Sequence, residues 1–175
     1  AKRKAKYYRK KGFVVGAQDE ATFGLIPLIA RGWAKKGSRP IAIINHANKY
    51  TNVFGARSKN SFVFSFSTTK KQKDFIQFLK KLLKRWRKVL LFVDGAKAHH
   101  GKLVKKFLSE HKKVIRIEYF PKYSPETNPV EQCWKPARKK LSNRLIKSLP
   151  AMKYHLKNTF NDNKSMPKMF HYLRD

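Results

Sequence analysis

The segment VLLFVD, at Val89–Asp94, is an unbroken apolar run that ends in a carboxylate. A run of this kind is typical of a strand in the middle of a parallel sheet, where both faces are buried. Amphipathic patterns precede and follow it, with apolar residues at helical spacing from Phe75 to Trp86 and from Leu103 to Leu108. The segment therefore predicts strand–helix alternation around a parallel core strand.

Further strand-like runs lie on either side of this core strand. Phe13–Asp19 reads FVVGAQD and predicts a second buried strand that also ends in an aspartate. Tyr50–Ala56 and Ser61–Ser67 are β-branched or aromatic runs that predict an antiparallel meander, and Val114–Phe120 predicts a fifth main strand. We therefore expect an α/β fold: a mixed five-stranded sheet, with three antiparallel strands and then two parallel ones, flanked by helices.

Glycine and proline mark the expected loops between these elements. Residues 21–40 contain five of them and predict an irregular excursion around short strands, of which Pro40–Asn45 is one. Pro121–Pro129 predicts a second loop, which is rich in residues that interrupt helices and strands. Pro136 falls inside the next helical pattern, and we expect it to kink that helix or to end its first segment.

Capping residues predict where the helices begin. Thr68 and Thr69 are expected N-caps of the helix after the meander. Asn128 can cap the helix after the second loop, with Pro129 in the first turn. Two further short helices are expected near the C-terminus: Pro150–Phe160 and Pro167–Leu173.

Composition and charge limit the class of protein. With 175 residues, 41% of them hydrophobic and 13% aromatic, the chain is long enough for one domain with a real core. Lys and Arg number 42 against 10 Asp and Glu, and the net charge of +32 predicts a polyanionic partner and salt-sensitive binding. Charge alone leaves a ribosomal-type or membrane-surface protein as alternatives. No apolar run approaches the ~18 residues of a membrane span, and no signal peptide is visible.

The N-terminal segment is strongly basic. Seven of the first eleven residues are Lys or Arg, with Tyr7 and Tyr8 between them. We expect residues 1–11 to be a basic arm or linker that lies on nucleic acid rather than a core element. The residues expected to contact DNA from this segment are Lys2, Arg3, Lys4, Arg9 and Lys10.

Three of the rare acidic residues stand where metal-dependent phosphodiester chemistry needs carboxylates. Asp19 and Asp94 each end an apolar run, and Glu131 stands in the first turn of a helix. If the first and fourth strands are neighbours, both aspartates reach adjacent strand ends, where open α/β sheets usually bind ligands. Oxygen ligands suit Mg²⁺ or Mn²⁺, and a pair of such ions can activate a nucleophile and stabilise a leaving oxygen. Taken singly, each acid could instead be a turn, cap or helix-dipole residue.

Four motifs occur in order along the chain: QDE at Gln18–Glu20, RGWAKKGSRP at Arg31–Pro40, FVDGAKAHH at Phe92–His100 and YSPETNPVEQCW at Tyr123–Trp134. Together they resemble the catalytic domain of Tc/mariner-type transposases and their bacterial insertion-sequence relatives. These form the DDE group, which has a ribonuclease-H-like fold. The resemblance covers roughly residues 14–145.

The resemblance implies that Asp19, Asp94 and Glu131 are both the catalytic and the metal-binding residues, with two Mg²⁺ or Mn²⁺ ions per active site. It implies a ribonuclease-H-like catalytic domain at residues 12–149, after the basic arm. Residues 150–175 are then expected to be a C-terminal helical extension.

Other residues of the motifs are expected to assist the triad or to bind DNA. Glu20 and Asn128 are the expected supporting residues. His99 either contacts the scissile phosphate, orients an acid or has a plain surface role, and Trp33 either stacks on DNA or packs under its loop. Beyond the N-terminal arm, DNA contacts are expected from Trp33, Lys97, His99 and Lys122.

The implied activity is metal-dependent cleavage of DNA at transposon ends and strand transfer into target DNA. The implied partners are double-stranded DNA, as transposon ends and as target, and a second copy of the chain in a synaptic dimer. The expected location is the cytoplasm of a bacterium or archaeon, in association with the nucleoid. Two alternatives stay open: a ribonuclease-H-like nuclease without strand transfer, and an inactive DNA-binding remnant of a decayed element.

Overall fold

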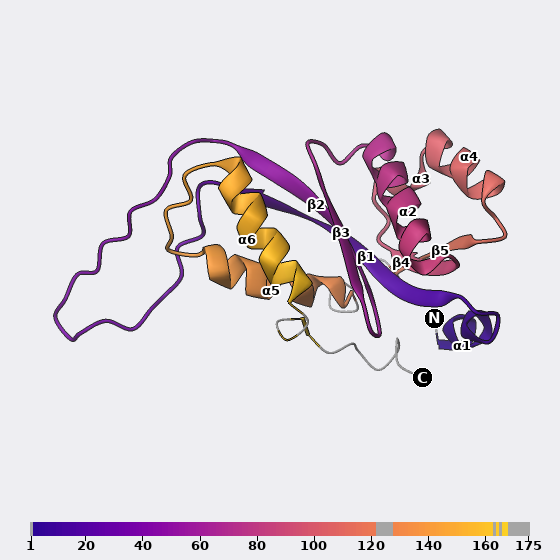
Figure 1. Cartoon of the computed structure of the whole chain (residues 1–175), viewed down its shortest axis with the longest axis horizontal. Helices are drawn as coiled ribbons and strands as arrows, with labels where there is room; N and C mark the ends of the chain where they lie inside the picture. The colour runs from indigo at the N-terminus through magenta and orange to yellow at the C-terminus, as the bar shows by residue number, and fades with distance from the viewer. Residues whose placement is uncertain (1, 122–127, 163, 165, 168–175) are drawn as a thin grey trace.

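The computed structural model describes residues 2–121, 128–162, 164, 166 and 167. Its centre is a five-stranded sheet in the order β3-β2-β1-β4-β5 (Figure 1). The strands are β1 Val14–Gly24, β2 Tyr50–Ser58, β3 Phe62–Ser67, β4 Val89–Val93 and β5 Ile115–Tyr119. The helices are α1 Lys2–Lys10, α2 Gln72–Trp86, α3 Lys97–His100, α4 Lys102–Glu110, α5 Val130–Leu141 and α6 Leu149–Asn161.

The sheet is mixed, which confirms the prediction from the apolar runs. β1 pairs antiparallel with β2, and β2 antiparallel with β3, whereas the β1–β4 and β4–β5 pairs are parallel. The first and fourth strands are therefore neighbours, with Ala17 of β1 opposite Phe92 of β4. Because β1, β3, β4 and β5 run in the same direction, the segments that follow them gather at one edge of the sheet.

Helices cover both faces of the sheet and enclose two hydrophobic cores (Figure 1). On one face, α1, α5 and α6 contribute side chains such as Trp134 and Leu156. On the other face, α2 and α4 contribute Phe75, Leu82 and Val104. Alternate residues of each strand point into the two cores, so every central strand is buried on both sides.

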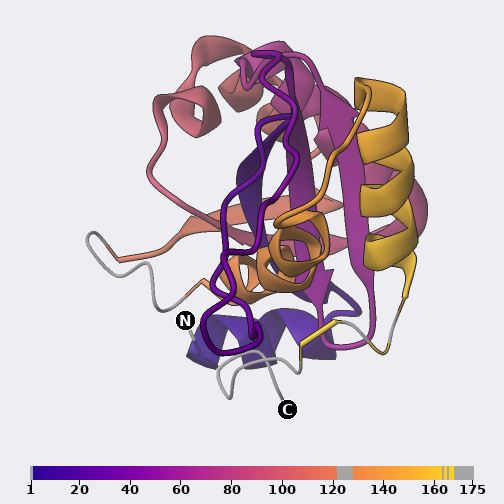
Figure 2. The same ribbon diagram turned by 90° about the vertical axis from the view of Figure 1, so that its left-hand side faces the viewer.

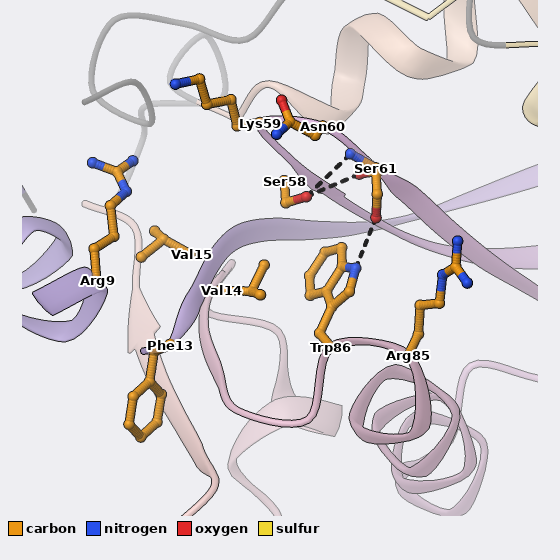
Figure 3. A pocket seen from close by; sticks show the side chains of 10 residues that line it. All are labelled: Arg9, Phe13, Val14, Val15, Ser58, Lys59, Asn60, Ser61, Arg85 and Trp86. Atoms are coloured by element: carbon orange, nitrogen blue, oxygen red, sulfur yellow. Dashed lines mark hydrogen bonds between the residues drawn. The ribbon is translucent and has the colours of Figure 1, made fainter. Parts of the chain in front are cut away.

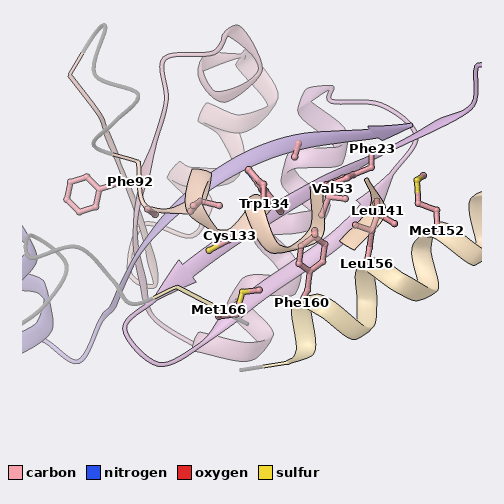
Figure 4. Close-up of a cluster of buried hydrophobic side chains, with 14 of the residues drawn as sticks. Phe23, Val53, Phe92, Cys133, Trp134, Leu141, Met152, Leu156, Phe160 and Met166 are labelled. Atoms are coloured by element: carbon pink, nitrogen blue, oxygen red, sulfur yellow. The ribbon is translucent and has the colours of Figure 1, made fainter. Parts of the chain in front are cut away.

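The core under α5 and α6 is built around Trp134 (Figure 4). Its indole packs edge to face on the rings of Phe23, Phe62 and Phe160, with centroid distances of 6.2, 5.9 and 5.7 Å. Gly55 of β2 makes room for this ring, because a Cβ at that position would lie 2.5 Å from an indole carbon. The position of Trp134 over the sheet therefore depends on a glycine in the strand below it.

Helix α2 follows the predicted apolar spacing but begins later than expected. The predicted caps, Thr68 and Thr69, precede it, and Lys71 occupies the N-cap position. The Asp74 carboxylate accepts hydrogen bonds from the Ser67 and Thr69 hydroxyls and from the Lys71 N–H. An acid in the first turn both caps the helix and complements its dipole, so the helix begins where Asp74 can do this.

Helix α5 differs from the prediction at Asn128, which was the expected cap, and at Pro136, which was expected to kink or end the helix. Pro129 rather than Asn128 occupies the N-cap position, although the Asn128 Oδ1 accepts a hydrogen bond from the Val130 N–H at 3.1 Å. Pro136 does not end the helix, which continues to Leu141. The apolar face of α5 is buried against the sheet, and this burial offsets the hydrogen bond that the proline removes.

The N-terminal segment 1–11 is not an arm outside the core, because it contains helix α1. Ala5 is buried in the same core as α5 and α6, and Tyr8 packs against that core. Lys4 forms an ion pair with Glu118 of β5, with 2.7 Å between Nζ and Oε2. The prediction was wrong because the high charge of the segment hid a short apolar face.

The loop between β1 and β2 is long and irregular, as expected, and extends away from the helices (Figures 1 and 2). The strand predicted at Pro40–Asn45 is absent from it. The apolar residues that suggested that strand, Ile41 and Ile43, have no sheet to pack on and are 91% and 72% exposed. The base of the loop is held by the Asn45 Nδ2, which donates to the Ile146 carbonyl oxygen at 2.8 Å.

The C-terminal part confirms one of two predicted helices. α6 covers the helix predicted at Pro150–Phe160, and the Ser148 hydroxyl caps it by accepting the Ala151 N–H at 3.3 Å. The helix predicted at Pro167–Leu173 falls almost wholly outside the described residues. Among the residues described, no helix has both the length and the hydropathy that crossing a bilayer requires.

Candidate active site

Asp19 and Asp94 come from neighbouring parallel strands. Asp19 stands in the middle of β1, opposite Gly55 of β2, and Asp94 directly follows β4. The register pairs Ala17 with Phe92, so continuing it by two residues sets Asp94 opposite Asp19. Paired strands lie roughly 4.8 Å apart, so the fold brings the backbones of the two predicted aspartates to the same region of the sheet.

The Asp19 carboxylate is mostly buried and receives a hydrogen bond from a ring. Its Oδ2 accepts the indole N–H of Trp134 at 2.8 Å. Burial raises the pKa of Asp19 to about 7, against the lowering effect of the Trp134 hydrogen bond, and the charges of Glu131 and Glu20 raise it as well. A carboxylate in such surroundings is costly to ionise unless a cation compensates its charge.

The start of α5 brings Glu131 toward Asp19. Asn128 is buried, and its Nδ2 donates to the Gln18 carbonyl oxygen on β1 at 3.3 Å. Glu131 lies in the first turn that follows, exposed to solvent, and its charge acts on Asp19. Asn128, an expected supporting residue, therefore ties the helix that carries Glu131 to the strand that carries Asp19.

Asp94 contacts a buried histidine on the face of the sheet that α2 covers. The His99 side chain is 1% exposed, with Nδ1 2.8 Å from Asp94 Oδ1 and Nε2 2.8 Å from Glu20 Oε1. Burial alone would lower the pKa of His99, but the hydrogen bonds to these two carboxylates raise it to about 10. The same contact with His99 is the main cause that lowers the pKa of Asp94 below its usual value.

The acids at this edge fit a divalent cation that prefers oxygen ligands. Asp19, Asp94 and Glu131 offer only carboxylate oxygens, the ligands that Mg²⁺ and Mn²⁺ favour. Burial is the main cause of the raised pKa of Asp19, the charges of Glu131 and Glu20 add to it, and a bound cation would favour the ionised carboxylate. Among the described residues, the group of possible metal ligands whose atoms lie within 4.8 Å of one another is Glu20, Asp94 and His99, but both ring nitrogens of His99 already face carboxylate oxygens.

The residues expected to contact DNA fall into different surroundings. Trp33 is 106% exposed, which excludes packing under its loop. The ring of His99 is buried and contacts two acids rather than solvent, which contradicts a plain surface role. Lys122 lies outside the described residues. The remaining candidates that are exposed are Lys2, Arg3, Lys4, Lys10 and Lys97.

Two of the cavities that basic side chains line lie at the start of β1 and near Asp94. One, of about 370 Å³, lies at the start of β1 and has Val14 and Trp86 on its apolar side (Figure 3). Its cationic residues are Arg9, Lys59 and Arg85. The other, of about 610 Å³, lies between the starts of α2 and α3, at the edge where Asp94 stands. Its cationic residues are Lys71, Lys73 and Lys97.

Sequence reasoning missed two contacts that shape the site. It was not predicted from the sequence that the Trp134 indole donates to Asp19 or that Glu20 contacts His99. The sequence did contain a signal for the contact between Trp134 and Asp19. Trp134 follows Glu131 by three residues, so both lie on one face of the helix.

A mixed five-stranded sheet with acids from two adjacent parallel strands and from a following helix defines the ribonuclease-H-like class of proteins that process nucleic acids. The sequence profile of the DDE superfamily endonucleases matches residues 15–153 of this chain. The chain belongs to that family.

A curated relative is the insertion element IS630 uncharacterized 39 kDa protein of Shigella sonnei. It is 29% identical over 122 residues, which are 67% of this chain and 35% of the relative. The chain therefore spans about a third of that protein's length.

Solved structures share the fold at low sequence identity. The Mos1 transposase paired-end complex with left transposon end gives a TM-score of 0.69 at 17% identity, over 98% of this chain and 54% of that one. The catalytic domain of Mos1 mariner transposase gives 0.62 at 14% identity, over 98% and 80%. The catalytic core domain of BIV integrase gives 0.50 at 12% identity, over 83% and 82%. These similarities confirm the ribonuclease-H-like fold.

Proposed function

We propose that this chain is the catalytic domain of a DDE transposase, which cleaves phosphodiester bonds at transposon ends and joins the freed 3′-hydroxyl to target DNA. The observation that carries the proposal is the arrangement of Asp19 and Asp94 on adjacent parallel strands, with Glu131 acting on Asp19. Membership of the DDE superfamily endonucleases supports DNA cleavage. The similarity to Mos1 transposase over 98% of the chain supports strand transfer in addition.

Asp19, Asp94 and Glu131 would hold the metal, as two ions of Mg²⁺ or Mn²⁺. When bound, such ions lower the pKa of an attacking water or hydroxyl and stabilise the leaving oxygen. The side chains around the site hold the metal-binding carboxylates in place. Trp134 holds Oδ2 of Asp19 and His99 holds Oδ1 of Asp94, so each aspartate keeps its other oxygen for the metal.

Basic residues near Asp94 are suited to hold the DNA backbone. Lys97 begins the short helix after Asp94, and it shares a cavity with Lys71 and Lys73. The ammonium groups of these lysines can pair with phosphates on either side of the scissile bond. Trp33 offers an exposed ring on which a base can stack.

A second copy of the chain is the proposed protein partner. The loop between β1 and β2 exposes Ile29, Trp33 and Ile41, whose exposed fractions are 76%, 106% and 91%. Exposed apolar groups gathered on one segment are typical of an interaction surface. In a synaptic dimer this loop would lie against the other copy or its DNA. The bacterial relative supports the bacterial cytoplasm as the location.

One assay distinguishes the transposase from the two alternatives. Supercoiled DNA and a labelled oligonucleotide end are incubated with the protein and Mn²⁺. Products in which the oligonucleotide is joined to the plasmid support the transposase. Nicking without joining supports a nuclease that lacks strand transfer, and DNA binding with neither product supports an inactive remnant.

Two acid-to-amide variants test which residues carry the reaction. Asp94→Asn is expected to lose both nicking and joining, because it removes a metal ligand. Glu110→Gln makes the same chemical change at an exposed position at the end of α4, and it is expected to behave as the wild type. If Asp94→Asn forms as much product as the wild type, the assignment of the active site is wrong.

A further inference from the structure

Glu20, His99 and Asp94 form a continuous set of contacts across the two parallel strands. His99 lies between the two carboxylates, 2.8 Å from each. Glu20 Oε1 also accepts a hydrogen bond from the Gln18 Nε2 at 2.9 Å, and Asp94 Oδ1 accepts the Ala96 N–H at 3.0 Å. One oxygen of each carboxylate is therefore held by two donors.

The His99 residue that connects the acids has little freedom to move. Its ring packs on Phe75 with 4.4 Å between ring centroids. Its backbone N–H donates to the Ala96 carbonyl oxygen at 2.9 Å, and its own carbonyl oxygen accepts the Tyr119 hydroxyl at 3.3 Å. The contact of Nε2 with Glu20 adds to these constraints and favours the ring orientation that presents Nδ1 to Asp94.

We propose that Glu20 and His99 are positioning residues that aim the Asp94 carboxylate at the metal. They fix Oδ1, and the Asp94 side chain, which is 51% exposed, then presents Oδ2 to the open edge of the sheet. The inference rests on the proposed function, because it requires Asp94 to be a metal ligand. Loss of a group that orients a metal ligand typically costs about 10–100-fold in metal affinity or activity.

A metal ion held directly by Glu20, Asp94 and His99 is the competing interpretation. Their ligand atoms lie within 4.8 Å of one another. However, the two carboxylates face different nitrogens of the His99 ring, and one ion cannot bind both nitrogens of the same ring. The contacts of 2.8 Å are those of charge-assisted hydrogen bonds.

Two amide variants of His99 separate positioning from general damage to the fold. The side-chain amide of Asn stands near the place of Nδ1, so His99→Asn can still donate to Asp94 but cannot reach Glu20. The amide of Gln stands near the place of Nε2, so His99→Gln can still donate to Glu20 but releases Asp94. Both variants lose one buried hydrogen bond, and thermal unfolding shows whether each is folded.

Binding of Mn²⁺ to the full chain, followed by the loss of the free-ion electron paramagnetic resonance signal, is the main measurement. His99→Gln is expected to weaken Mn²⁺ binding by about 10–100-fold, whereas His99→Asn, which keeps a donor to Asp94 but loses the contact with Glu20, is expected to weaken it less. Glu20→Gln is expected to weaken binding to a smaller degree, because it loosens the ring without removing it. The Mn²⁺ concentration that gives half-maximal DNA nicking should follow the same order.

Equal Mn²⁺ affinity of His99→Gln and His99→Asn would overturn the inference, and so would nitrogen hyperfine coupling that shows His99 bound to the ion. If Asp94→Asn binds Mn²⁺ as the wild type does, the inference fails together with its premise. If the predicted order of affinities appears but the wild type neither nicks nor joins DNA, the positioning role stands and the proposed activity is wrong.

Discussion

At the scale of single residues, Asp19 links the site to the stability of the fold. Its pKa is about 7 in the folded protein, against an ordinary value of 3.8. Because the folded-state value is the higher one, the folded protein holds a proton that the unfolded chain releases. This contribution to stability is therefore complete below the ordinary pKa and is lost as the pH rises through about 7.

The variant Asp19→Asn tests this linkage, because the amide cannot ionise. Without metal, we expect it to raise the free energy of unfolding at about pH 8 by at most about 4 kcal/mol, and to change it little at about pH 4. Urea unfolding in EDTA at both pH values measures the difference. His99, with its pKa raised to about 10, also loses its stabilising effect at high pH, but it does so in both proteins. Parallel pH profiles for variant and wild type would contradict the account.

Trp134→Phe removes the ring donor to Asp19 while keeping an aromatic side chain in the core. The hydrogen bond from Trp134 lowers the pKa of Asp19, so its loss should move the pH midpoint of stability upward. The smaller ring also leaves a cavity, and we expect a loss of about 1–3 kcal/mol in the free energy of unfolding at neutral pH. The pH profile of unfolding measures both effects. A loss of stability with an unchanged midpoint would mean that Trp134 acts only through packing.

The acidic residues of the candidate site were predictable from the sequence, but the hydrogen-bond partners that shift their pKa values were not. Asp19 and Asp94 each follow an apolar run, and the parallel pairing of these two runs places the acids on neighbouring strands. The partners of these acids come from far along the chain, because Trp134 is 115 residues from Asp19 and Glu20 is 79 residues from His99. Such pairs depend on the register between elements, which no local pattern contains.

At the scale of elements, strands and helices with a continuous apolar pattern were predictable. β4 and α2 are buried along one face or both, so their periodicity appears directly in the sequence. β1 continues past its predicted end at Asp19 to Gly24, because polar residues such as Glu20 and Thr22 still pair with β2. Backbone pairing needs no apolar side chain, so the sequence pattern ends before the strand does.

Gly55 gives a prediction for the packing of α5 on the sheet. A Cβ at Gly55 would lie 2.5 Å from Trp134 and 2.9 Å from Phe62, and both rings are confined by neighbours. Gly55→Ala is therefore expected to lower the free energy of unfolding by about 1–3 kcal/mol and to displace Trp134 from Asp19. Gly32→Ala is the matched control, since a Cβ at Gly32 meets nothing within 4 Å. Equal stability of the two variants, measured by urea unfolding, would contradict the packing described for α5.

At the scale of the whole molecule, the net charge of +32 governs how the chain meets DNA. If the chain makes about 6–10 phosphate contacts, its affinity should fall about 10³–10⁵-fold between about 50 and 200 mM salt. Fluorescence anisotropy with a labelled duplex at several salt concentrations gives the slope. The variant Lys97→Ala should make the slope shallower by about one unit, because it removes one phosphate contact. A slope that Lys97→Ala leaves unchanged would place the DNA away from the acids.

The position of the metal relative to Asp19 and Asp94 can be measured directly. Crystals of the protein soaked in Mn²⁺ and measured at the manganese absorption edge locate the ion by its anomalous scattering. We expect density between the carboxylates of Asp19 and Asp94, on the side of Glu131, with Trp134 and His99 still bonded to the two aspartates. Strong anomalous density elsewhere in the chain, with none at these carboxylates, would contradict the account.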